Sequence, residues 1–167
     1  MRLAKRLIVT LCLGVAVTAF GQGQYVRVPM HLKSAKTFYV TGRVAGSRAN
    51  DFMVDTGSSY TTINEHTLVE LRTQGDTRYV RDLIAVLANG QEIVVPIYWV
   101  SSFEVGGVCT LQNIEVAVFP SRTRQILGLN TLSKASPFQF SVNPPELKLS
   151  NCQTAGPGQA QLADRPS

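Results

Sequence analysis

The sequence predicts one domain of mostly β structure with one or two short helices. Val, Thr, Ile, Tyr and Phe recur in short runs, and Gly, Pro and Asn interrupt these runs. Because β-branched and aromatic residues favour strands while Gly, Pro and Asn favour turns, the pattern is typical of a β domain. Of the 167 residues, 44% are apolar and 16% charged, which suffices for a single hydrophobic core.

The first 21 residues have the layout of a secretory signal peptide. Basic residues precede an apolar stretch over 7–20, and the small residues Ala19 and Gly21 stand before a possible cleavage site at Gln22. The apolar stretch is short for a transmembrane helix, which needs about 20 residues, so we expect no stable membrane span after cleavage. An uncleaved anchor is the alternative. We therefore expect an exported protein, periplasmic or secreted.

The rest of the chain divides into a domain over 22–152 and a disordered tail over 153–167. The tail is rich in Gly, Pro, Gln and Ala and lacks apolar periodicity. Without the signal segment, 13 Lys and Arg remain against 11 Asp and Glu, so the formal net charge of +5 belongs mostly to that segment. No basic stripe with interleaved aromatic residues occurs, and nucleic-acid binding is therefore not expected.

The expected strands begin with an edge strand and a hairpin. Residues 24–30 alternate in polarity, and Pro29, which has no N–H to donate, favours an edge position. Residues 36–44 and 50–55 are extended runs joined by a small, polar turn. The second strand of this hairpin ends at Asp55.

Two short helices are expected, each beginning at an asparagine. Asn64 is a suitable N-cap for a helix through about Arg72. Asn130 is a second candidate N-cap, for a helix that ends before Pro137. Both helices are too short to dominate the fold.

A long hairpin is expected in the middle of the chain. Residues 79–88 and 91–100 are extended apolar runs on either side of Asn89-Gly90, and this dipeptide favours a two-residue type I′ turn. Such a hairpin either closes over a ligand as an arm or is an ordinary part of a β-sandwich. The remaining expected strands span residues 61–63, 109–119, 125–127, 138–142 and 147–150.

Asp55 stands at the end of a strand, in the segment Phe-Met-Val-Asp-Thr-Gly-Ser-Ser over 52–59. A carboxylate in this place either takes part in chemistry or caps its own turn, with Gly57 supplying a positive φ. We favour chemistry because a second motif, Ile126-Leu127-Gly128-Leu129-Asn130, accompanies the first.

Hydrolysis by carboxylates alone requires two of them, one ionised and one protonated. Asp51 lies four residues before Asp55 on the same strand and cannot fold back onto it, while Asp76 and Asp82 lack a following Thr-Gly. The second acid must therefore come from another copy of the chain, and a two-fold homodimer would bring Asp55 against its counterpart.

The two motifs together resemble those of the retropepsin-like aspartic proteases, most closely the exported, single-domain bacterial members. The resemblance extends over about 36–152. It implies a closed, mostly antiparallel β-barrel of the acid protease type, in which the second motif (Ile126, Leu127, Gly128 and Asn130) supports the Asp55 loop.

The resemblance also implies a role for each residue of the first motif. Asp55 would be the catalytic acid, and the hydroxyl of Thr56 would bond to the active-site loop of the partner subunit. Gly57 would permit the backbone turn, and Ser58 would hydrogen-bond the carboxylate. The hairpin tip, formed by Ala88, Asn89 and Gly90, would be the flap.

The implied function is that of an aspartic endopeptidase. Two Asp55 carboxylates of a homodimer would activate a water molecule, and the substrate would be an extended peptide or an unfolded protein. Leu87, Ala88, Ile93 and Val95 are candidate pocket walls. The alternative is a non-catalytic domain of the same fold that binds a peptide or a protein partner.

Two cysteines remain after the signal segment, Cys109 and Cys152. In an oxidising compartment two such cysteines more often pair than stay free, so we expect a disulfide, with two buried or intermolecular thiols as the alternative. His31 and His66 show no metal-ligand spacing with these cysteines. No metal and no cofactor are therefore expected.

Overall fold

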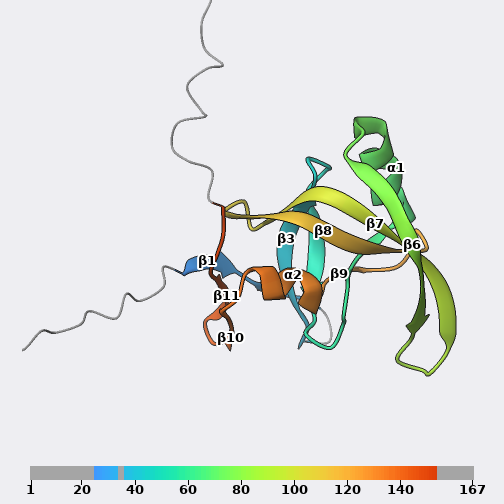
Figure 1. Ribbon diagram of the computed structural model, residues 1–167. Helices are drawn as coiled ribbons and strands as arrows, with labels where there is room; N and C mark the ends of the chain where they lie inside the picture. The colour runs from blue at the N-terminus through green and yellow to red at the C-terminus, as the bar shows by residue number, and fades with distance from the viewer. Residues whose placement is uncertain (1–24, 34–35, 154–167) are drawn as a thin grey trace, which may run out of the picture.

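The computed structural model of the chain describes residues 25–33 and 36–153. The expected signal peptide lies outside these residues, as does the expected tail apart from Gln153. The described part consists mostly of strands with two short helices (Figure 1). None of its helices is long and apolar enough to cross a membrane.

The described strands and helices follow the expected order closely. In chain order they are β1 (Val26–Pro29), β2 (His31–Leu32), β3 (Phe38–Val44), β4 (Asn50–Val54), β5 (Thr61–Asn64), α1 (Glu65–Gln74), β6 (Thr77–Val86), β7 (Glu92–Val105), β8 (Cys109–Phe119), β9 (Gln125–Leu127), α2 (Leu129–Lys134), β10 (Phe138–Val142) and β11 (Pro145–Leu149).

The strands form two sheets. The smaller has the order β1-β11-β10, and the larger has the order β2-β3-β4-β9-β5-β8-β7-β6. A further pairing of β3 with β7 joins six strands of the larger sheet in a ring. Most pairings are antiparallel, as expected, but β4 with β9 and β5 with β8 are parallel, so the larger sheet is mixed.

The first hairpin and the first helix are confirmed. β3 and β4 pair with Tyr39 opposite Met53, and β1, which contains Pro29, is an edge strand. At the start of α1, the Asn64 side chain accepts a hydrogen bond of 3.0 Å from the backbone N–H of Thr67. This bond satisfies one of the N–H groups that a helix start leaves unpaired.

The second helix begins two residues earlier than the sequence suggests. Gly128 occupies the N-cap position of α2, and no side chain caps this end. Asn130, expected as the cap, lies within the helix instead. The asparagine side chain is thereby available for contacts outside the helix, which are described below.

The turn between β6 and β7 is longer than the expected two-residue type I′ turn. Leu87 and Gln91 flank it, with a 2.8 Å bond from the Leu87 N–H to the Gln91 carbonyl, and Gly90 has φ of 82°. Asn89 does not share the positive φ that a type I′ turn requires at both central residues. The loop is therefore a three-residue loop that closes on a left-handed glycine.

Figure 1 shows the hairpin of β6 and β7 projecting beyond the rest of the larger sheet. We call its outer part, residues 81–97, the arm. The arm contributes Val95 and Ile97 to a small apolar cluster that also contains Ala117 of β8 and is separate from the main core. The main core includes Phe52 and Phe103, whose rings meet edge to face with centroids 4.8 Å apart.

The expected disulfide is present between Cys109, at the start of β8, and Cys152. Next to it, Gln153 and Thr110 exchange two backbone hydrogen bonds of 3.0 and 3.1 Å. Gln153, expected as the first residue of the tail, therefore belongs to the folded domain. These contacts attach the end of the described chain to the larger sheet.

Candidate active site

The Asp55 loop, residues 55–60, connects β4 to β5. Its first residue is held by the neighbouring parallel strand, because the Asp55 N–H donates to the Leu127 carbonyl of β9 at 3.1 Å. The Gly57 N–H donates to Asp55 Oδ1 at 2.9 Å, and the half-buried carboxylate is thereby oriented. Within the described residues Oδ2 accepts no hydrogen bond, so it is available to a water molecule or a second acid.

Ser58 differs from its expected role, and Gly57 differs from the alternative interpretation, in which Asp55 caps its own turn. The Ser58 hydroxyl donates to the Tyr60 carbonyl at 2.9 Å and not to the Asp55 carboxylate. Gly57 does not adopt a positive φ, so its value here lies in the room it leaves. A Cβ at Gly57 would stand 3.2 Å from Asp55 Oδ1, closer than most such contacts. The side chain of Thr56 is exposed.

The start of α2 supports the far side of the loop. The N–H of Leu129 donates to the Ser58 carbonyl at 2.8 Å, and the N–H of Asn130 donates to the Ser59 carbonyl at 3.1 Å. Helix starts leave their first N–H groups without partners inside the helix, and the loop carbonyls supply these partners. The second motif therefore holds the first, as expected.

Asn130 connects three segments. Its Oδ1 accepts from the Thr61 N–H at 2.8 Å, and its Nδ2 donates to the Glu115 carbonyl of β8 at 2.7 Å. Beside it, the buried Thr61 hydroxyl donates to Thr131 Oγ1 at 2.6 Å and accepts from the Gly128 N–H at 3.0 Å. Sequence patterns assign no role to Thr61 and Thr131, because the hydrogen bond between their hydroxyls joins residues 70 positions apart in the chain.

Gly128 is required by close packing. A Cβ at this position would stand 2.2 Å from the Tyr60 carbonyl oxygen and 2.7 Å from the Thr61 backbone nitrogen. The two residues before Gly128 lie in β9, between β4 and β5. Ile126 pairs with Met53 on one side and with Thr62 on the other, and Leu127 is fully buried. The second motif thus brings two backbone segments into contact.

The inner face of the arm lies against the same loop. Its side chains alternate, and Leu83, Ala85 and Ile93 pack with Tyr60 on the small cluster. Val95, a candidate pocket wall, is a buried member of that cluster. The expected flap residues Ala88, Asn89 and Gly90 are exposed at the tip.

Residues 40–131 match the family model described as aspartyl protease. The chain belongs to this family. Its fold is similar to that of a retropepsin-like aspartic protease from Rickettsia conorii, seen in a crystal structure, with 20% identity and a TM-score of 0.52. The match covers 77% of this chain and 91% of the other. No curated protein matches the chain.

Asp51, the acid nearest to Asp55 in this aspartyl protease sequence, is engaged elsewhere. Its carboxylate pairs with Lys33 at 2.6 Å and with His31 at 3.3 Å. The hydrogen bond from Lys33 is the largest cause that holds the pKa of Asp51 below its usual value. Asp51 is thus not poised as the second acid of an Asp55 pair.

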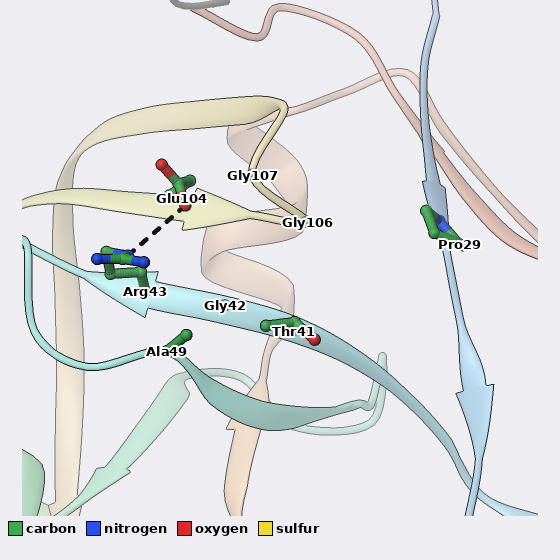
Figure 2. A pocket seen from close by; sticks show the side chains of 8 residues that line it. All are labelled: Pro29, Thr41, Gly42, Arg43, Ala49, Glu104, Gly106 and Gly107. Atoms are coloured by element: carbon green, nitrogen blue, oxygen red, sulfur yellow. Dashed lines mark ion pairs between the residues drawn. The ribbon is translucent and has the colours of Figure 1, made fainter.

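Two surface hollows differ in their relation to Asp55. One, of about 300 Å³, lies between β1, β3 and the end of β7, with Arg43 and Glu104 paired across it at 3.8 Å (Figure 2). It contains no residue of either motif. The other, of about 480 Å³, borders the Asp55 loop. Its lining residues are Ser59, Tyr60, Asn113, Glu115, Asn130 and Lys134.

Among the described residues, no group of three or more His, Cys, Asp or Glu side chains is arranged to hold a metal ion. His31 pairs with Asp51, and His66 lies 3.5 Å from Glu70 on α1. At the Asp55 loop itself the structure shows a carboxylate and backbone hydrogen-bond donors.

Proposed function

We propose that this aspartyl protease is a homodimeric endopeptidase in which two Asp55 carboxylates activate one water molecule. The main support is the geometry of the Asp55 loop: a strand end, a glycine N–H and the start of α2 fix one carboxylate, whose Oδ2 remains available. The six strands joined in a ring would then form the closed barrel that the resemblance implies.

The reaction would need no covalent intermediate. Two carboxylates within hydrogen-bond distance cannot both be ionised at low cost, so they share one proton and titrate as a pair. The ionised member takes a proton from water, and the protonated member polarises the carbonyl of the peptide bond. Each copy of the chain would supply one member.

A second copy would meet exposed groups of the first. Thr56 lies exposed beside Asp55, where its hydroxyl can bond to the partner's loop. In the smaller sheet β11 already has neighbours on both sides, so a strand from another copy would add at the outer edge of β1 or β10. Phe140 and Val142 of β10 are 40% and 64% exposed. Burial of these side chains would favour association.

The substrate would be an extended peptide held between the arm and the Asp55 loop. The inner face of the arm is apolar, and a strand-like peptide presents alternate side chains to such a surface. We therefore expect cleavage next to apolar residues. Export to a periplasm or out of the cell, after removal of residues 1–21, would make unfolded or extended proteins of that compartment the substrates.

The decisive experiment is a digest of a peptide library with the purified protein and its Asp55→Asn variant across a range of pH. Cleavage by the wild type with an optimum in the acidic range, and its loss in Asp55→Asn, is expected because the pair must share one proton. The matched control is Asp76→Asn, which removes an exposed acid outside both motifs. Equal cleavage by Asp55→Asn would refute the proposal, and peptide binding without turnover by the wild type would favour the non-catalytic alternative.

A further inference from the structure

Arg81, at the base of the arm, makes contacts that no motif predicts. Its guanidinium donates to both carboxylate oxygens of Glu115 on β8, at 3.0 and 2.7 Å. The same Nη2 donates to the Tyr60 hydroxyl at 2.9 Å. One side chain thus connects the arm, β8 and the Asp55 loop.

A β-bulge directs Arg81 to this position. The pairing of β6 with β7 runs from Tyr79 opposite Tyr98 to Arg81 opposite Ile97, so Val80 is an extra residue. Because side chains alternate along a strand, this insertion places Arg81 on the face that Ile97 shares. Leu83 follows on the same face, opposite Val95.

Glu115 reaches the same face from β8. Ile97 pairs with Ala117, and Glu115 lies two residues before Ala117, so it projects to the same side of the sheet. The bidentate pair of Arg81 and Glu115 therefore lies at the edge of the small apolar cluster. Glu115 and Tyr60 also line the hollow of about 480 Å³.

The geometry makes Tyr60 the contact between the arm and the Asp55 loop. Tyr60 packs against the same small apolar cluster as Leu83 and Ile93 of the arm, while its hydroxyl accepts the bond from Arg81. Its own carbonyl accepts from Ser58, three residues after Asp55. A shift of the arm would break the bond at the hydroxyl and displace the ring from the cluster.

We propose that Arg81, held by Glu115, is a positioning residue that fixes Tyr60 and the arm relative to the Asp55 loop and so defines one wall of the pocket in which the proposed peptide would lie. This inference rests on the proposed peptidase function for its consequence in catalysis. The positioning itself is a property of the fold and can be measured without activity.

The test compares Tyr60→Phe, which removes one hydroxyl, with Arg81→Met, which removes every donor and keeps an unbranched apolar stem. The control is Arg48→Met, because Arg48 makes a similar charge-assisted contact of 2.6 Å to Glu70 away from the arm. Backbone amide exchange is followed over residues 83–95. Loss of such contacts is expected to speed exchange there roughly ten-fold in Arg81→Met and by a smaller factor in Tyr60→Phe.

Exchange over 83–95 should remain at the wild-type rate in Arg48→Met, and unfolding curves of all variants show whether any change is global. Wild-type exchange in both folded Tyr60→Phe and Arg81→Met would overturn the proposal, whether or not the protein cleaves peptides. If Arg81→Met does not fold, Tyr60→Phe decides alone, since it deletes one oxygen atom.

Kinetics provide the second readout once cleavage by the wild type is established. For peptides with an apolar side chain next to the scissile bond, KM is expected to rise several-fold in Tyr60→Phe while kcat changes little, because a pocket wall acts on binding. Arg81→Lys should reverse only part of the rise in KM that Arg81→Met causes, since a lysine cannot reproduce the forked guanidinium that contacts Glu115 and Tyr60 together. A several-fold fall in kcat with unchanged KM in Tyr60→Phe would overturn the assignment of Arg81 to the pocket wall.

Discussion

At the scale of single residues, two kinds of constraint act at the Asp55 loop. The Asp55 carboxylate is oriented by a hydrogen bond from Gly57, whereas Gly128 and Asn130 hold the backbone around it. Gly128 allows close backbone packing because it has no side chain, whereas the Asn130 side chain both donates and accepts hydrogen bonds. Different substitutions should therefore separate chemistry from support.

Gly128→Ala should destabilise the fold. The added Cβ would stand 2.2 Å from a backbone oxygen of Tyr60, which cannot move aside as a flexible side chain would. We expect a loss of about 1–3 kcal/mol or more in unfolding free energy, the range for overpacking, measured by urea denaturation. Gly57→Ala is the comparison, because its Cβ would meet only the end of the Asp55 side chain. Equal stability of Gly128→Ala and wild type would contradict the close approach.

The ion pair of Glu115 should make stability depend on pH in a predictable direction. The hydrogen bond from Arg81 is the largest cause that lowers the pKa of Glu115 from its ordinary value of 4.5. The folded protein therefore favours the ionised acid, so the stabilisation is complete above pH 4.5 and is lost as pH falls through the lower pKa of the folded state.

Unfolding curves of wild type and Glu115→Gln, recorded between pH 6 and pH 3 in steps of about half a pH unit, test this expectation. The difference between the two curves isolates Glu115 from other acids with lowered pKa, such as Asp51 and Glu70. The wild type should lose its advantage over Glu115→Gln as the pH falls below 4.5. A constant difference across the whole range would count against the ion pair.

At the scale of elements, parallel pairing decides where the motifs meet. β4 and β9 are parallel neighbours and end together at Val54 and Leu127, so the residues that follow each strand emerge side by side. The two motifs are separated by more than half of the domain in sequence. On its other side β9 pairs with β5, where Thr62 faces Ile126, and β5 forms the second parallel pair of the sheet with β8.

The disulfide should stabilise the domain by closing a long loop. Cys109 and Cys152 are 43 residues apart in sequence, for which the chain-entropy relation gives roughly 4 kcal/mol. Unfolding free energy should fall by a few kcal/mol in the Cys109→Ser/Cys152→Ser double variant and in reduced wild type. The same double variant should show no further change on reduction. Recovery of the two cysteines as unlinked peptides in a non-reducing digest would contradict the pairing.

At the scale of the whole molecule, the proposed activity depends on two chains. One Asp55 is present in each chain, and Asp51 is engaged by Lys33. In the proposed dimer, a second copy would meet the exposed Thr56 and an outer edge of the smaller sheet, at β1 or β10. Activity should therefore fall on dilution below the dissociation constant of the dimer.

A mixing experiment measures this dependence directly. When equal amounts of wild type and Asp55→Asn exchange subunits at random, about one quarter of the dimers have two intact acids. Peptide cleavage should therefore fall to about 25% of that of the same total amount of wild type, against about 50% if each chain acts alone. Asp76→Asn in place of Asp55→Asn should leave cleavage unchanged. A value near one half would argue for independent subunits.

Most of the fold could be predicted from local patterns. The hairpin ending at Asp55, the Asn64 cap and the order of strands follow from alternation and turn residues, which are short-range properties. Two details were wrong. The start of α2 was placed two residues too late, because the Asn130 side chain makes long-range contacts and does not cap the helix. The turn at Gly90 was assigned the wrong type, because Leu87 and Gln91 pair around three residues. The parallel pairings were not predicted, since no local pattern specifies which strands become neighbours.

The amino-acid pattern alone was enough to predict the family and the disulfide, from an acid before Thr-Gly, a second glycine motif, and two cysteines that pair. The contact of the Ser58 hydroxyl with Tyr60 and the reach of Arg81 to the loop were visible only in the folded chain. The physical reason is that side-chain direction depends on neighbours brought together by strand pairing and by a bulge, and these neighbours are distant in the chain.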